Sequence, residues 1–247
     1  MRTLVLSVGN TTIFCGVFAG DRLVRSFRLP AAARGLGRAV AARAGGPAAG
    51  AFLCSVVPSL TPAVARELKR AIGRGPEILT AASPHGLEIG YRRPGQLGTD
   101  RLAAALGARR RFAGRNVIVV DCGTATTVTA LGRGGRLLGG AILPGLALWP
   151  EMLAARTAKL PRVPVRRPAA AVGRSPPEGI ASGVYFGHAG AIRELVRRIR
   201  AEAFGREPVL VVGTGGHAPL LAKEGLFAVL EPNLILYGLR AFGSVLG

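Results

Sequence analysis

The run VIVVDCGTATTVT at residues 117–129 constrains the fold of this chain most. Its apolar part is typical of a buried strand, and it ends in Asp121 and a turn of small residues. A weaker copy, LVLSVGNTTIF, occupies residues 4–14, with Ser7 at the position that corresponds to Asp121. An internal repeat of this kind indicates two related halves, each opening with a strand, a glycine turn and a second strand.

Short apolar stretches and turn residues predict the elements of the rest of the chain. Residues 3–29, broken at Gly9-Asn10 and Gly20-Asp21, predict three consecutive antiparallel strands. Thr61 precedes Pro62 at the start of a periodic stretch, which predicts a helix with Thr61 as its N-cap. The other expected elements are strands at 51–57, 77–80, 136–144 and 208–216, and helices at 36–43, 62–72, 102–112, 146–157, 179–200 and 234–245.

The order of these elements repeats. Strands, helix, strand, helix, strand, loop and helix are followed by much the same sequence of elements again. We therefore predict an α/β protein with two similar domains, residues 1–113 and 114–247, and a cleft between them.

The charge of the chain favours an anionic partner. Lysines and arginines number 33 against 13 aspartates and glutamates, a formal charge of +20. Only three of the basic residues are lysines, and the arginine clusters carry almost no interleaved aromatic residues. We therefore expect an anionic substrate in preference to nucleic acid, which the charge alone leaves open.

A cytoplasmic location is expected by default. No apolar run reaches the roughly 18 residues typical of a membrane-spanning helix, and the first residues lack a signal-peptide pattern. The cysteines, Cys15, Cys54 and Cys122, are too few for a disulfide framework and are expected to be reduced, packed thiols. The histidines at 85, 188 and 217 are too dispersed in the sequence to argue for a metal site.

Glycine turns after strands can present backbone N–H groups to phosphate oxygens, because a residue without Cβ lets the backbone approach a ligand closely. Residues 9–12, 123–127 and 213–216 each offer such a turn. None matches GxxxxGK[ST], and no GxGxxG follows a strand. The turns predict nucleotide binding on a fold other than a P-loop or dinucleotide-binding fold.

The chain has only three aspartates, Asp21, Asp100 and Asp121. Asp21 follows Gly20 between two predicted strands, which is typical of a hairpin turn. Thr99 or Asp100 stands at a helix N-terminus, so Asp100 is either an N-cap or a functional carboxylate, and the two roles are compatible.

The chain resembles the type III pantothenate kinases, in the superfamily of actin, sugar kinases and heat-shock chaperones, over nearly its full length. The resemblance implies duplicated actin-like (ribonuclease H-like) domains with a nucleotide cleft between them. It rests on VGNTTIFCGVF (8–18), SVVPSLT (55–61), GYRRPGQLGTDR (90–101), DCGTATT (121–127), GGAILPG (139–145), RTAKLP (156–161), ASGVYFG (181–187) and GTGGHAPLLAK (213–223).

This resemblance implies ATP-dependent phosphorylation of pantothenate to 4'-phosphopantothenate, the first step of coenzyme A biosynthesis. Asp100 would be the general base, and Asp121 would bind a monovalent cation, K⁺ or NH₄⁺. ATP would be accompanied by Mg²⁺, and the family forms homodimers. Pantothenate would be held by Tyr91, Gly98, Thr99, Asp100 and Arg101, and ATP by Ser7, Val8, Gly9, Asn10, Thr11, Thr12, Ile13, Phe14 and Thr124.

Three positions depart from the family pattern. Ser7 and Thr129 stand where the family has aspartate, and Pro176 stands where it has threonine. Magnesium in nucleotide sites usually relies on one or two carboxylates besides the phosphates. The departures leave two alternatives open: a catalytically impaired member that acts as a binding or transcription-accessory protein, or a kinase for another small hydroxy acid.

Overall fold

The computed structural model describes residues 2–32 and 34–246, which form two compact units. Unit 1 comprises residues 1–114, 134–137 and 233–247, and unit 2 comprises residues 115–133 and 138–232. Packing thus assigns the C-terminal helix to unit 1, although it follows unit 2 in the sequence. The division into halves at residues 113 and 114 stays a prediction about the internal repeat.

A five-stranded sheet forms the centre of unit 1, in the order β3-β2-β1-β4-β5. A short glycine turn joins β1 to β2, so these strands are antiparallel, whereas β4 follows a helix and lies parallel to β1. The three predicted antiparallel strands are confirmed. The strands are β1 (Arg2–Val8), β2 (Thr12–Ala19), β3 (Arg22–Pro30), β4 (Ala48–Ser55) and β5 (Glu77–Ile78).

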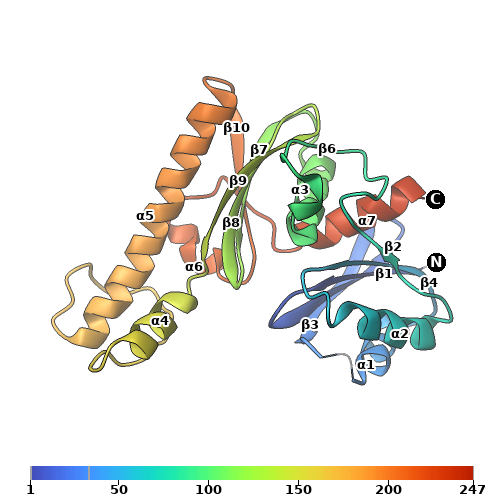
Figure 1. Cartoon of the computed structure of the whole chain (residues 1–247), viewed down its shortest axis with the longest axis horizontal. Helices are drawn as coiled ribbons and strands as arrows, with labels where there is room; N and C mark the ends of the chain where they lie inside the picture. The colour runs from blue at the N-terminus through green and yellow to red at the C-terminus, as the bar shows by residue number, and fades with distance from the viewer. Residues whose placement is uncertain (1, 33, 247) are drawn as a thin grey trace. The chain divides into compact units, whose positions relative to one another are not determined.

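Helices cover both faces of this sheet (Figure 1). On one face Leu4 and Leu53 share a buried cluster with α1 (Leu36–Ala44) and α2 (Thr61–Ile72). The other face packs on α3 (Thr99–Arg111) and α7 (Leu234–Leu246), where the rings of Phe18 and Tyr237 meet edge-on with centroids 5.8 Å apart. Strand residues alternate between faces. Ser7 and Cys54 directly follow Leu6 and Leu53 of this cluster, so they belong to the face that α3 and α7 cover.

A second sheet runs in the order β11-β10-β7-β8-β9-β6. In unit 2, β7 (Asn116–Cys122) and β8 (Ala125–Leu131) form a hairpin, and β10 (Val209–Thr214) lies parallel to β7. The long helix α5 (Pro176–Phe204) lies along β7 and β8, with α4 (Leu148–Arg156) beside it (Figure 1). Val120, Val128 and Tyr185 belong to the buried cluster that these elements share.

The remaining elements are short or lie at sheet edges. β6 pairs with the first two residues of β9, and both of these pieces belong to unit 1. The remaining elements are β6 (Glu88–Ile89), β9 (Arg136–Pro144), β11 (Val229–Leu230), α6 (Ala218–Leu221) and the 3₁₀ turns η1 (Pro94–Gln96) and η2 (Ala222–Glu224).

Among the described helices, we find no segment with the length and the unbroken apolar character that crossing a membrane requires.

The predicted N-cap of α2 is wrong. The N-cap position is Leu60, and no side chain caps the helix there. The Thr61 hydroxyl instead donates to the carbonyl oxygen of Val57 at 2.9 Å, and Thr61 Oγ1 lies within hydrogen-bond distance of Ser55 Oγ at 2.7 Å. Thr61 is thus the first helical residue, and its side chain ties α2 to the end of β4.

Close packing of α3 on α7 generates a test of the fold. A Cβ atom on Gly238 would stand 1.7 Å from the carbonyl oxygen of Ala103. Gly238→Ala must push the helices apart, and overpacking costs about 1–3 kcal/mol. We expect the melting temperature, measured by circular dichroism, to fall by roughly 5 °C.

Gly187→Ala is the matched control. Gly187 lies in α5, and a Cβ atom there meets no atom within 4 Å. Replacing a helix-interior glycine then stabilises by about 0.5–1 kcal/mol. Equal melting temperatures for the two variants would contradict the packing described for α3 and α7.

Candidate active site

The β1–β2 hairpin holds the residues predicted to bind ATP phosphates in unit 1. Ser7 and Val8 end β1, and Thr12 begins β2. The turn is closed by a hydrogen bond from Gly9 N to the carbonyl oxygen of Thr12 at 3.0 Å. Asn10 and Thr11 are exposed at its tip. The hairpin therefore has the exposed, tightly turned backbone that phosphate binding requires.

Strand β4 ends beside this hairpin. Ser7 and Cys54 are register partners, and Val56 N donates to the carbonyl oxygen of Val8 at 3.0 Å. Cys54 is fully buried, and burial raises the pKa of its thiol to about 12; the Ser7 hydroxyl opposes that rise and the Asp100 charge adds to it. Ser7 and Asp100 thus both influence the pKa of one neutral thiol.

Asp100 is the second residue of α3, and its alternative role as the N-cap is wrong. Gly98 occupies the N-cap position, and Arg101 N donates to Asp100 Oδ1 at 2.7 Å. Burial raises the pKa of the Asp100 carboxyl, and the bond from Arg101 N and the Arg101 charge oppose that rise. The helix N-terminus adds a favourable dipole. The result is a shielded carboxylate held by its own helix.

Arg101 and Tyr91 form the second predicted part of the substrate site. The Arg101 side chain is 6% exposed, and its Nη1 donates to the Tyr91 hydroxyl. Its guanidinium carbon lies 5.5 Å from the centroid of the Tyr91 ring. The structure therefore brings Tyr91, from the loop before η1, against the first turn of α3, and the shared role in binding pantothenate stays a prediction.

In unit 2, Asp121 and Thr124 stand at the β7–β8 turn, beside the glycine turn that follows β10. His217 N donates to the carbonyl oxygen of Cys122 at 3.0 Å. Gly215 has φ +86°, and a Cβ atom there would lie 2.3 Å from Asp121 Oδ1. A glycine is required because the backbone passes directly over the carboxylate.

A buried polar group supports this turn, and the sequence analysis missed it. Thr126 Oγ1 and His188 Nε2 lie 3.1 Å apart, and both side chains are buried. The Trp149 ring meets the His188 ring edge-on. Burial, with a contribution from nearby His217, lowers the pKa of His188 to about 4. Histidines 29 residues apart in sequence are therefore neighbours, because α5 returns the chain to the β7–β8 turn.

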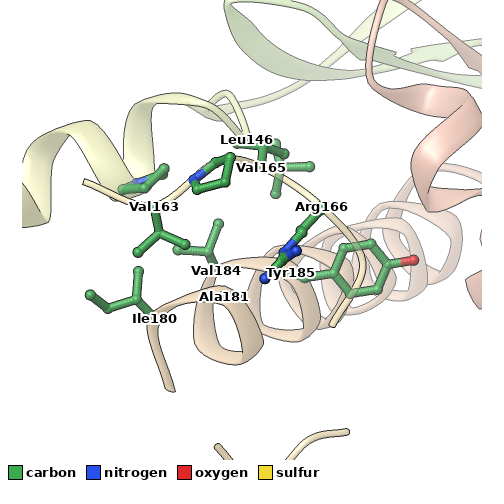
Figure 2. Close-up of a pocket in the computed structure, with 10 residues that line it drawn as sticks. Leu146, Val163, Val165, Arg166, Ile180, Ala181, Val184 and Tyr185 are labelled. Carbon is green, nitrogen blue, oxygen red and sulfur yellow. The ribbon is translucent and has the colours of Figure 1, made fainter. Parts of the chain in front are cut away.

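The loop before α5 contains no substrate-sized cavity at its apolar end. Val163 and Val165 face Ile180 and Val184 of α5 across a gap (Figure 2). The gap has a volume of about 10 Å³ and holds no more than a water molecule. This end of the loop is packing, and the predicted substrate residues lie in unit 1.

Comparison with known proteins decides the family. The family model for type III pantothenate kinase matches residues 3–198. The chain is 39% identical over 246 residues to the type III pantothenate kinase of Legionella pneumophila (strain Corby), with 96% of each chain covered. It is 34% identical to that of Dehalococcoides mccartyi (strain ATCC BAA-2266 / KCTC 15142 / 195), covering 97% of this chain and 96% of the relative.

This chain belongs to the type III pantothenate kinase family. The predicted resemblance is therefore confirmed, and the kinase family model spans both hairpins and Asp100. The fold is also similar to the activator of the 2-hydroxyisocaproyl-CoA dehydratase from Clostridium difficile with bound ADPNP, with a TM-score of 0.52, 13% identity and 99% and 96% of the chains covered. That likeness concerns the fold alone, the predicted α/β fold of duplicated actin-like domains.

The three departures from the pantothenate kinase pattern have local explanations in the structure. Thr129 is 2% exposed and pairs with Val119, so it occupies an apolar strand position without charge. Pro176 opens α5 at the helix position that suits proline, and Ser175 Oγ accepts from Glu178 N at 3.5 Å. Ser7 is the register partner of the buried Cys54. None of the three introduces an unpaired charge.

His188 generates a test of the support beneath the β7–β8 turn. Its pKa is about 4 when folded and about 6.5 otherwise, so between these pH values the unfolded chain binds the additional proton. The stability of the folded kinase therefore falls with acidification in that window, on the order of 1–2 kcal/mol at pH 5. His188→Gln keeps a hydrogen-bonding group but does not titrate.

We expect a smaller loss of melting temperature between pH 7 and pH 5 in His188→Gln than in the wild type. Differential scanning calorimetry at the two pH values measures this loss. Identical losses in the two proteins would show that His188 does not carry the effect.

Proposed function

We propose that this protein transfers the γ-phosphoryl group of ATP to the hydroxyl of pantothenate, forming 4'-phosphopantothenate and ADP. The observation that carries the proposal is the position of Asp100. It is a half-buried carboxylate at the start of α3, and the preceding Thr99 is hydrogen-bonded to Ser55, which follows Cys54, the register partner of Ser7. A base and a phosphate-binding turn on one sheet are what phosphoryl transfer to a hydroxyl needs.

Asp100 is the proposed general base. As the pantothenate hydroxyl oxygen bonds to the γ-phosphorus and the bond to the bridging oxygen of ADP breaks, the hydroxyl proton passes to the Asp100 carboxylate. Burial raises the pKa of this carboxyl, which makes the carboxylate a stronger base than an exposed aspartate. Arg101 offers the charge for pairing with the carboxylate of pantothenate.

The phosphates and the cations are assigned to the glycine turns. We assign ATP phosphates to residues 7–14 and Thr124, and a monovalent cation, K⁺ or NH₄⁺, to Asp121. The cradle over Asp121 formed by Gly215 supports that cation. Magnesium would arrive with ATP and neutralise phosphate charge, and because Ser7 is uncharged, the phosphates would supply most of its ligands.

The wider properties follow the family. We propose a cytoplasmic homodimer without nucleic-acid function. Large apolar side chains exposed on unit 2, namely Ile142, Met152 and Val172, support a self-association surface. No observation on the described residues favours the alternatives of a binding or transcription-accessory protein or of a different hydroxy-acid substrate.

Removing the base tests the proposal. We expect Asp100→Asn to lower kcat in a coupled ADP-release assay by about 10²- to 10⁴-fold, the usual contribution of a general base. The same change should raise the melting temperature at neutral pH. The pKa of Asp100 is raised on folding, so ionisation costs stability above that pKa, and asparagine removes the cost. The gain in melting temperature should shrink as the pH falls toward the unfolded pKa.

Asp21→Asn is the control for loss of an aspartate. Asp21 lies in the β2–β3 turn, where it pairs with Arg110 at 2.9 Å and Arg240 at 3.3 Å. These are exposed ion pairs worth about 0–1 kcal/mol, so kcat should not change. A fully active Asp100→Asn protein would rule out Asp100 as the base.

Cation dependence tests Asp121. Loss of one charge-assisted contact costs roughly 1.5–3 kcal/mol, so Asp121→Asn should raise the K⁺ concentration for half-maximal activity about 10- to 100-fold. Titration of ADP release with KCl, with choline chloride at constant ionic strength, measures this. An unchanged K⁺ titration would remove Asp121 from the cation site.

A further inference from the structure

The hydroxyl of Thr99 binds the backbone of a single residue twice. Thr99 Oγ1 accepts from Ser55 N at 3.1 Å and donates to the carbonyl oxygen of Ser55 at 2.8 Å. The two residues are 44 positions apart in the chain. The first residue of α3 is therefore tied to the last residue of β4.

These two bonds use the only proton of the Thr99 hydroxyl. A threonine side chain has one donor and two acceptor lone pairs, and Ser55 takes the donor and one lone pair. The hydroxyl cannot also donate to a ligand. A role in holding pantothenate, which the family resemblance implies for residue 99, would therefore fall to its backbone rather than to its side chain.

The contact between Thr99 and Ser55 links the helix of the proposed base, Asp100, to the strand beside the β1–β2 hairpin. Asp100 follows Thr99 directly, and its Oδ1 accepts from Arg101 N in the same helix. On the other side of the contact, Ser55 is preceded by Cys54, the register partner of Ser7, and followed by Val56, whose N donates to the carbonyl oxygen of Val8. One hydroxyl thus connects the helix of the base to the strands that carry the hairpin.

We propose that Thr99 is a positioning residue for Asp100, whose hydroxyl fixes the start of α3 against β4 and so sets the place of the carboxylate relative to the β1–β2 hairpin. This inference rests on the proposed function, in which Asp100 is the base. Displacement of a catalytic group by about 1 Å can cost on the order of 10²-fold in rate.

The chain supplies a matched control at the same place. Thr61 Oγ1 lies 2.7 Å from Ser55 Oγ and donates to the carbonyl oxygen of Val57 at 2.9 Å. It therefore binds Ser55 through the side chain and holds α2, not α3. Thr61→Val removes a threonine hydroxyl that also contacts Ser55, and it leaves the two Thr99 bonds in place.

The experiment compares Thr99→Val, Thr99→Ala, Thr99→Ser and Thr61→Val with the wild type by steady-state ADP release, varying pantothenate and ATP separately, and by melting temperature. We expect Thr99→Val and Thr99→Ala to lower kcat about 10- to 100-fold, with KM for pantothenate changed less than about threefold. Thr99→Ser keeps the hydroxyl and should restore kcat to within about threefold of the wild type. Thr61→Val should lower the melting temperature and leave kcat unchanged.

Three results would overturn the proposal, and the third is normal activity of Thr99→Ala. A rise in KM for pantothenate at unchanged kcat would make the Thr99 side chain a substrate ligand, and an equal loss of kcat in Thr61→Val would make the effect one of general stability. If Thr99→Val does not fold, Thr99→Ala decides by the same criteria. Asp100→Asn, assayed in parallel, separates the base role of Asp100 from the positioning role of Thr99. If Asp100→Asn is active, the proposed base is wrong. If it is inactive and Thr99→Ala has normal activity, only the positioning role of Thr99 fails.

Discussion

Hydrogen bonds between the ends of β1 and β4 fix the position of the β1–β2 hairpin relative to α3, the helix that carries the proposed base Asp100. β1 forms a hairpin with β2 on one side and pairs in parallel with β4 on the other. The parallel register places Ser7 beside Cys54, and the bond from Val56 N to Val8 continues it to the edge of the glycine turn. If this register slipped by one residue, Ser7 would turn to the opposite face of the sheet, away from α3 and Asp100.

Burial determines the chemistry of the charged and titratable groups at the site. Withdrawal from water raises the pKa of Asp100 and of Cys54 and lowers that of His188. Unit 1 therefore contains a strengthened proton acceptor and a neutral thiol, and unit 2 contains a neutral imidazole. The chain has only three aspartates, and for the two with proposed roles, Asp100 and Asp121, position matters more than number, as is general for phosphoryl transfer.

The local parts of the fold could be predicted from the sequence, whereas contacts between distant residues could not. Apolar runs and glycine turns foretold both hairpins, and the periodic stretches foretold the helices. Thr61 was predicted to be an N-cap because it precedes proline, but its hydroxyl bonds Ser55 and Val57 instead. The partners of Thr99 and of His188 lie 44 and 62 residues away, and no local pattern encodes such pairs. The packing of α7 in unit 1 has the same cause.

Direct detection of the product tests the central claim, that the half-buried Asp100 and the proposed phosphate hairpin make this family member a working pantothenate kinase. The purified chain would be incubated with ATP, Mg²⁺, K⁺ and pantothenate, and the small molecules analysed by mass spectrometry. The account predicts 4'-phosphopantothenate and an equal amount of ADP, neither of which forms when pantothenate is omitted. Binding of ATP without any phosphorylated pantothenate would contradict it.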